Sequence, residues 1–211
     1  SAADTPGPTD TTAPTDTLEP TPEPSDTSAP ADTPGTTGIP PTSPPQTAGP
    51  VPVGTHLVGA DIQPGIYVGS AGNSILTSCY WARLSDLSGE MDAVIANDNA
   101  MGHFYVEVLA ADRALETGCQ LLPIKAVAPP AALMTVFGPG IYIVGRDIAP
   151  GTYRGIAGDT IMESCYWARL SCVQGTMGCV VANDNATGQF FVQVAPSDFA
   201  LELACEVEKA E

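Results

Sequence analysis

The chain has 211 residues, of which 24 are acidic and 7 are basic, so its formal net charge is −17 at pH 7. Nucleic acids and anionic membrane surfaces are bound through basic patches, and the charge therefore excludes both as expected partners. The chain has only two histidines, and its six cysteines form no CxxC pair, so we expect no metal site and no cofactor.

The first part of the chain, residues 1–52, holds 14 of the 21 prolines and has no aromatic residue, lysine or arginine. A segment of this composition cannot bury a hydrophobic core of its own, and its prolines favour an extended chain. We therefore predict an extended Pro/Thr/Asp-rich arm. Thr and Ser beside Pro are also typical of O-glycosylated stalks, which makes glycosylation of the arm a hypothesis.

The rest of the chain is a tandem repeat. Residues 57–119 align without a gap on residues 143–205, a shift of 86 positions, with 36 of 63 positions identical. The octapeptide SCYWARLS occurs in both copies and contains the only two tryptophans of the chain. A repeat of this length is near the lower limit for a domain with its own core.

The repeat predicts two small domains, residues 53–124 and 139–211, joined by an apolar linker over residues 125–138. The uncharged stretch around this linker, residues 126–145, is long enough for a membrane span. Its prolines and glycines interrupt a helix at two places, so we expect no membrane insertion.

Both repeats have the pattern of β-strands. FYVEV at residues 104–108 and its counterpart FFVQV alternate apolar and other side chains with a period of two. The motif NDNAMG at residues 97–102 favours a tight turn over a calcium loop, because it has a single aspartate among its oxygen ligands. Short strands separated by turns predict an all-β fold of two tandem β-sandwich or partly open barrel domains.

Six cysteines allow 15 disulfide pairings. The first repeat contains only Cys79 and Cys119, which predicts this pair and the corresponding pair Cys165–Cys205. The remaining Cys172 and Cys179 replace an aspartate and an alanine of the first repeat. A hairpin closed by a two-residue Gly-Thr turn would place them opposite each other, at a spacing that a disulfide can bridge.

The same hairpin register places an indole, a guanidinium and a carboxylate on one face of each domain. This candidate binding patch consists of Trp81, Arg83 and Asp98 in the first domain and of Trp167, Arg169 and Asp184 in the second. Trp and Arg are frequent binding hot spots, and Trp beside a carboxylate suits a sugar. The alternative is structural: the Trp covers the disulfide inside the sandwich, as in immunoglobulin domains, and the Arg pairs with a nearby acid.

The pattern D-I-x-P-G-x-Y, S-C-Y-W-A-R-L-S, A-N-D-N-A-x-G and a final Cys resembles a small repeat module of secreted and surface-anchored bacterial proteins. The resemblance covers residues 57–119 and 143–205. It implies an extracellular or cell-surface β-module stapled by disulfides, often carried behind a Thr/Pro-rich stalk, and it implies no activity. The additional pair Cys172–Cys179 departs from this pattern.

No catalytic set of residues is recognisable, and we expect a protein that is not an enzyme. We predict a structural subunit of a surface fibre, sheath or coat, which associates with its own copies into a homopolymer. Similar domains in head-to-tail contact extend without limit when the rotation between them does not close. The alternative is a stalked cell-surface adhesion module that binds glycans.

Overall fold

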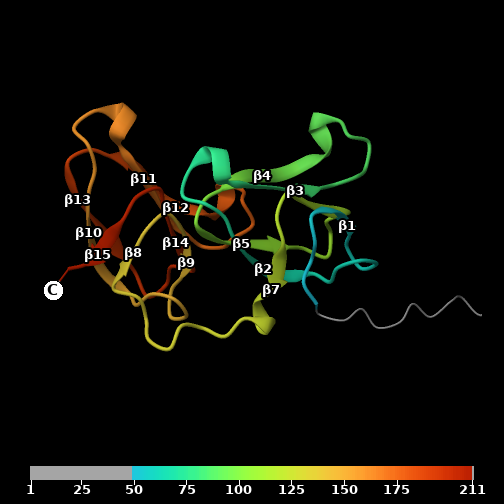
Figure 1. Ribbon diagram of the computed structural model, residues 1–211, viewed down its shortest axis with the longest axis horizontal. Helices are drawn as coiled ribbons and strands as arrows, with labels where there is room; N and C mark the ends of the chain where they lie inside the picture. Colours follow the sequence, from blue (N-terminus) through green and yellow to red (C-terminus); the bar gives the residue numbers. More distant parts are fainter. Residues whose placement is uncertain (1–48, 211) are drawn as a thin grey trace, which may run out of the picture. The chain divides into compact units, whose positions relative to one another are not determined.

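The computed structural model describes residues 49–210, and most of the predicted arm with its hypothetical glycosylation lies outside the described residues. Strands and single turns of 3₁₀-helix make up the described part, which contains no α-helix (Figure 1). The all-β prediction is therefore confirmed. Among residues 49–210 no helix has the length and apolarity needed to span a bilayer.

The first domain consists of two antiparallel sheets. Sheet 1A has the strand order β1-β6-β3-β4, and sheet 1B has the order β5-β2-β7. The strands are β1 (Gly54–Leu57), β2 (Gly65–Ser70), β3 (Cys79–Leu84), β4 (Val94–Ala100), β5 (His103–Val108), β6 (Ala114–Thr117) and β7 (Leu121–Pro123). The 3₁₀ turns are η1 (Ile75–Thr77), η2 (Met91–Ala93) and η3 (Ile124–Ala126).

The second domain repeats this arrangement. Sheet 2A has the order β12-β11-β14-β9, and sheet 2B has the order β13-β10-β15-β8. The strands are β8 (Val136–Phe137), β9 (Gly140–Ile143), β10 (Gly151–Ile156), β11 (Cys165–Leu170), β12 (Val180–Ala186), β13 (Gln189–Val194), β14 (Ala200–Leu203) and β15 (Val207–Lys209). The 3₁₀ turns are η4 (Ile161–Glu163) and η5 (Met177–Cys179).

One sheet runs through both domains. A parallel bridge between His103 of β5 and Gly140 of β9 joins sheet 1B to sheet 2A, which gives a seven-stranded sheet in the order β12-β11-β14-β9-β5-β2-β7.

Both domains also begin before the boundaries expected from the sequence. Val51 forms a bridge with Leu121, and the corresponding β8 pairs with β15, so each last strand gains an N-terminal partner.

The alternation within the strands places the cores. In β5, Phe104, Val106 and Val108 are buried inside the first domain, while Tyr105 and Glu107 point to the opposite face of sheet 1B. In the first domain a disulfide joins the start of β3 to the segment after β6, and in the second domain the corresponding disulfide joins the start of β11 to the segment after β14. The disulfides are Cys79–Cys119, Cys165–Cys205 and Cys172–Cys179, and the described residues include no free cysteine.

Two local predictions are wrong. The Asn-Asp-Asn motif lies within β4 and not in a turn, and the chain turns only at Met101 and Gly102, where Gly102 has a φ of 59°. β4 is the edge strand of sheet 1A, so its exposed asparagines stay in water while the backbone pairs with β3.

The predicted two-residue Gly-Thr turn is also wrong. β11 ends at Leu170 and β12 begins at Val180, so the connection holds nine residues, 171–179, including η5. The register is as predicted from Cys165 to Arg169 and then shifts at a bulge, where Leu170 pairs with Val180. The disulfide Cys172–Cys179 therefore closes a nine-residue connection instead of a tight hairpin. The length of this connection could not be inferred from the repeat.

Candidate functional site

The predicted patch of the first domain lies at the junction between the two domains. Trp81 of β3 is directly opposite Asp98 of β4 in the strand pairing, and Arg83 is two residues further along β3. Trp81 and Arg83 are 1% and 2% exposed, and Asp98 is partly buried. The patch is thus brought together as expected, but it is covered by the second domain.

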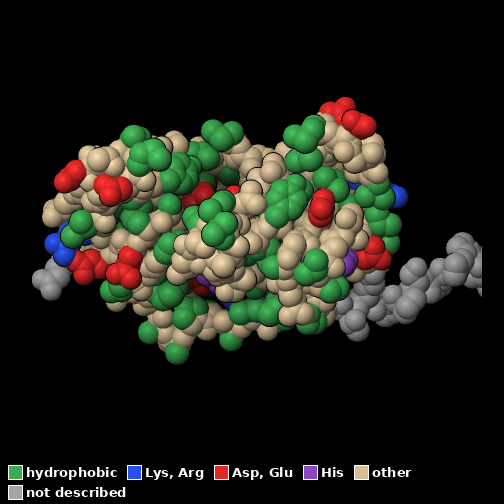
Figure 2. Space-filling view, turned by 45° about the horizontal axis from the view of Figure 1, so that its top comes forward, with side chains coloured by type: hydrophobic (Ala, Val, Ile, Leu, Met, Phe, Trp, Pro, Cys, Tyr) green, Lys and Arg blue, Asp and Glu red, His purple; other side chains and the backbone are tan. Residues whose placement is uncertain are grey.

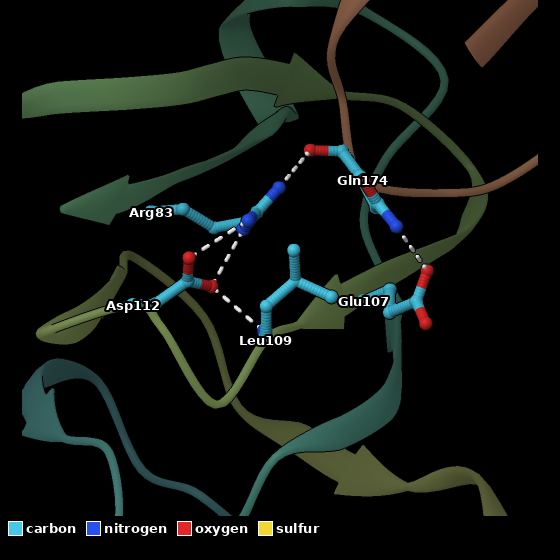
Figure 3. A network of polar contacts seen from close by, with 5 residues as sticks. All are labelled: Arg83, Glu107, Leu109, Asp112 and Gln174. Atoms are coloured by element: carbon cyan, nitrogen blue, oxygen red, sulfur yellow. Dashed lines mark hydrogen bonds and ion pairs between the residues drawn. The ribbon is translucent and has the colours of Figure 1, made fainter. Parts of the chain in front are cut away.

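Arg83 is held by a buried ion pair. Its Nε and Nη2 donate to the two carboxylate oxygens of Asp112, both at 2.7 Å, and both side chains are 2% exposed. Oδ2 of Asp112 also accepts the amide of Leu109 at 2.8 Å (Figure 3). A buried pair with its hydrogen bonds satisfied is costly to break, because removal of one partner leaves an uncompensated charge. Arg83 therefore has the structural role that the alternative interpretation gave it.

The third contact of Arg83 crosses to the second domain, where its Nη1 donates to the backbone oxygen of Gln174 at 2.8 Å. Gln174 belongs to residues 171–176, which we call the docking loop. In Figure 3 this loop enters from above, and Gln174 Nε2 donates to Glu107 Oε2 of β5 at 3.0 Å. The loop is thus tied by side chains to both sheets of the first domain.

The docking loop also adds to the edge of β5. The amide of Glu107 donates to the backbone oxygen of Val173 at 2.8 Å, and the Val173 side chain is 2% exposed within a hydrophobic cluster that both domains share. A methyl group on Gly175 would lie 2.3 Å from the indole of Trp81, so the backbone there touches the ring. The edge that β5 forms in sheet 1B is therefore covered by backbone of the second domain, from Val173 of the docking loop and from β9 at Gly140.

A second set of contacts between the domains involves Tyr105, two residues before Glu107 in β5. The hydroxyl of Tyr105 donates to Asp147 Oδ2 at 2.9 Å and accepts from Arg146 Nε at 3.3 Å. Arg146 Nη2 also donates to the backbone oxygen of Val127 in the linker at 2.7 Å. Burial raises the pKa of Tyr105 to about 12, so this hydroxyl stays protonated and can act as the donor.

Two cavities lie at the junction between the domains, with volumes of about 190 and 240 Å³. Both are lined by Asp98 of the first domain and by Ile141, Tyr166 and Glu202 of the second. Burial, with a smaller contribution from the negative charge of Asp98, raises the pKa of Glu202 to about 7. Burial also raises the pKa of Asp98. The two carboxyl groups come from different domains, so their ionisation at neutral pH opposes the contact between the domains.

The indole Nε1 of Trp81 is the one buried side-chain polar atom without a hydrogen-bond partner in the described part of the chain. Nor do residues 49–210 contain a group of three or more His, Cys, Asp or Glu side chains placed to hold a metal ion.

The corresponding patch of the second domain is open. Arg169 repeats the ion pair, with its Nε and Nη2 at 2.7 and 3.0 Å from Asp198, but its side chain is 23% exposed. Trp167 is partly buried, Asp184 is exposed, and Phe191, the counterpart of the buried Tyr105, is 54% exposed. Identical residues are therefore covered in one domain and accessible in the other.

Several residues of this junction were missed by the sequence reasoning: Tyr105, Asp147, Tyr166, Val173, Gln174 and Glu202. One signal pointed to the docking loop, since the disulfide that closes it has no counterpart in the first repeat. For Glu202 and Tyr166 the aligned Glu116 and Tyr80 are the same residue types, so the repeat gave no sign of a special role.

The fold and the junction define a class of protein: tandem, disulfide-stapled β-domains docked through a loop. Each domain matches the model of one family, described as the Rv1352-like extracellular domain, over residues 46–121 and 134–205. The chain belongs to this family, and the protein is extracellular. No curated protein and no solved structure matches the chain.

Proposed function

We propose that this extracellular protein is not an enzyme but a structural subunit of a surface fibre, sheath or coat. One observation carries the proposal: the Trp–Arg patch of the first domain is used to bind a neighbouring domain of the same family. The contact joins the docking loop of one domain to β5 of another, so it is heterologous. Repeated between copies of the chain, such a contact builds an open fibre when the rotation between the copies does not close.

The chemistry of the patch supports this role. Arg83 is committed to Asp112 and to the docking loop, and Trp81 is packed against backbone, so neither side chain is free to contact a substrate. The three disulfides suit a protein that has to persist outside the cell. The arm of residues 1–52, with O-linked glycans on its threonines, would cover such an assembly.

Electron microscopy of the protein purified from its native source tests the proposal. We expect filaments or ordered layers built from this chain. Single particles of one chain under all conditions, including the concentration found at the cell surface, would overturn the structural role.

A second candidate function is glycan binding by a stalked adhesion module, and the open patch of the second domain favours it. The two tryptophans provide a matched pair for the test. Trp167→Ala should then abolish binding on a glycan array, whereas Trp81→Ala should cost about 3–5 kcal/mol of stability because that indole is buried. No glycan signal in the unmodified protein would remove this candidate.

A further inference from the structure

The first domain carries an unused copy of the docking loop. This free loop, residues 85–90, and the η2 turn after it have the same backbone hydrogen bonds as the docking loop and η5: Ser85 N donates to Ala93 O at 2.8 Å where Ser171 N donates to Cys179 O at 2.7 Å. In place of the disulfide, Asp86 Oδ1 accepts the amide of Ser88 at 2.8 Å. The free loop is therefore already folded into the shape that docks.

This free loop is exposed. Leu87 takes the position of Val173, but its side chain is 54% exposed whereas that of Val173 is 2% exposed. Figure 2 shows acidic side chains next to hydrophobic ones at the upper right, where Figure 1 places the β3–β4 connection. An apolar centre with a charged rim is typical of a protein interface.

The second domain carries the matching surface. β13, the counterpart of β5, is an edge strand of sheet 2B, and its register with β10 is the one that β5 has with β2. The amide of Gln193 thus points away from β10, as that of Glu107 points away from β2. Phe191 and Ile156 on the same face are 54% and 69% exposed. An open strand edge beside two exposed apolar side chains can accept a loop from outside.

The open surface is more polar than the covered one. Arg154 stands opposite Phe191 at the position that Val68 has in the first domain, and it pairs with Glu208. We therefore expect the contact between two chains to be weaker than the contact within one chain, and reversible.

We infer that the exposed loop of the first domain docks on the open β13 face of the second domain of another copy of the chain. Leu87 then occupies the place of Val173, and its backbone oxygen accepts the amide of Gln193. This inference deepens the proposed function and rests on it, because it names the contact by which the subunit would extend.

Photo-crosslinking of the full chain tests the contact. The photoreactive residue p-benzoylphenylalanine replaces Phe191, and ¹⁴N- and ¹⁵N-labelled chains are mixed so that only links between copies are counted. We expect a link to the tryptic peptide 84–113, which contains Leu87 and no cysteine. The same probe at Val181, which is 52% exposed on β12, should give no such link.

A substitution provides the second readout. Leu87→Asp should raise the concentration of half-association, measured by sedimentation velocity, about tenfold or more. As a control, Leu76→Asp introduces the same charge at a leucine of the same domain that is 93% exposed. It should change the concentration of half-association less than about twofold. Both side chains are exposed, so both variants should fold.

The outcomes separate the inference from the proposed function. Filaments whose Phe191 probe links to another region would overturn the inference and leave the structural role standing. A closed dimer linked to peptide 84–113 would support the contact and refute the fibre. No association up to about 1 mM protein would overturn the contact, since affinities weaker than that do not hold an assembly together.

Discussion

Shortening Val173 to alanine tests whether the docking loop holds the two domains together. The side chain is 2% exposed in the hydrophobic cluster that the two domains share. Removing two buried methyl groups loses about 1.6 kcal/mol of transfer free energy, at about 0.8 kcal/mol per carbon, and the remaining cavity raises the cost to about 2–3 kcal/mol. Urea denaturation at low protein concentration, followed by tryptophan fluorescence, measures this loss.

The first domain provides the matched control. Leu87→Ala removes one more carbon from the same position of the same loop, but its side chain is 54% exposed. In a dilute sample it should change the free energy of unfolding by less than about 0.5 kcal/mol. Equal losses of stability for the two variants, or no loss for Val173→Ala, would show that the docked loop does not stabilise the junction.

Three further predictions concern the same junction. Gly175→Ala should destabilise by about 1–3 kcal/mol more than Gly89→Ala, as measured by thermal unfolding, because φ is 71° and 78° at the two sites and only the methyl at Gly175 meets the indole ring. Replacing Cys172 and Cys179 by serine should lower the free energy of unfolding by about 2.5 kcal/mol in urea titrations, and replacing them by Asp and Ala, as in the first domain, should recover part of this loss. The pKa of Glu202 is raised to about 7, so the stability that its protonated form contributes is fully present below the ordinary pKa of 4.5 and is lost as the pH rises through 7. The free energy of unfolding of the Glu202→Gln variant, relative to that of the unmodified protein, should therefore rise by up to about 3 kcal/mol between pH 4.5 and pH 8. A difference that does not depend on pH would contradict the burial of this carboxyl group.

The strands and the two main disulfides could be predicted from the sequence because both depend on local pattern and on the repeat. Alternating apolar residues specify β5 and β13, and a domain with two cysteines leaves one pairing inside that domain. The pairing of Trp81 with Asp98 also followed from the hairpin register. The edge-strand position of the Asn-Asp-Asn motif did not, because its residues favour turns and only the sheet around them decides otherwise.

The different environments of the two octapeptides could not be predicted at all. Trp81 and Trp167 lie in identical sequences, so nothing local distinguishes the buried indole from the partly exposed one. The difference comes from residues 171–176, which lie some 90 positions away from Trp81 and reach it only through the docking of the second domain. Contacts of this kind depend on tertiary structure rather than on propensity.

Hydrogen exchange at the amide of Gln193 tests whether the chains assemble through the β13 edge. The amide of Glu107, bonded to Val173 within the chain, serves as the internal reference and should be protected at every protein concentration. We expect the Gln193 amide to exchange fast in dilute solution and to become protected, together with the amides of the docked partner loop, in concentrated or assembled protein. A Gln193 amide that exchanges at the same fast rate in the assembled protein would rule out assembly through this edge.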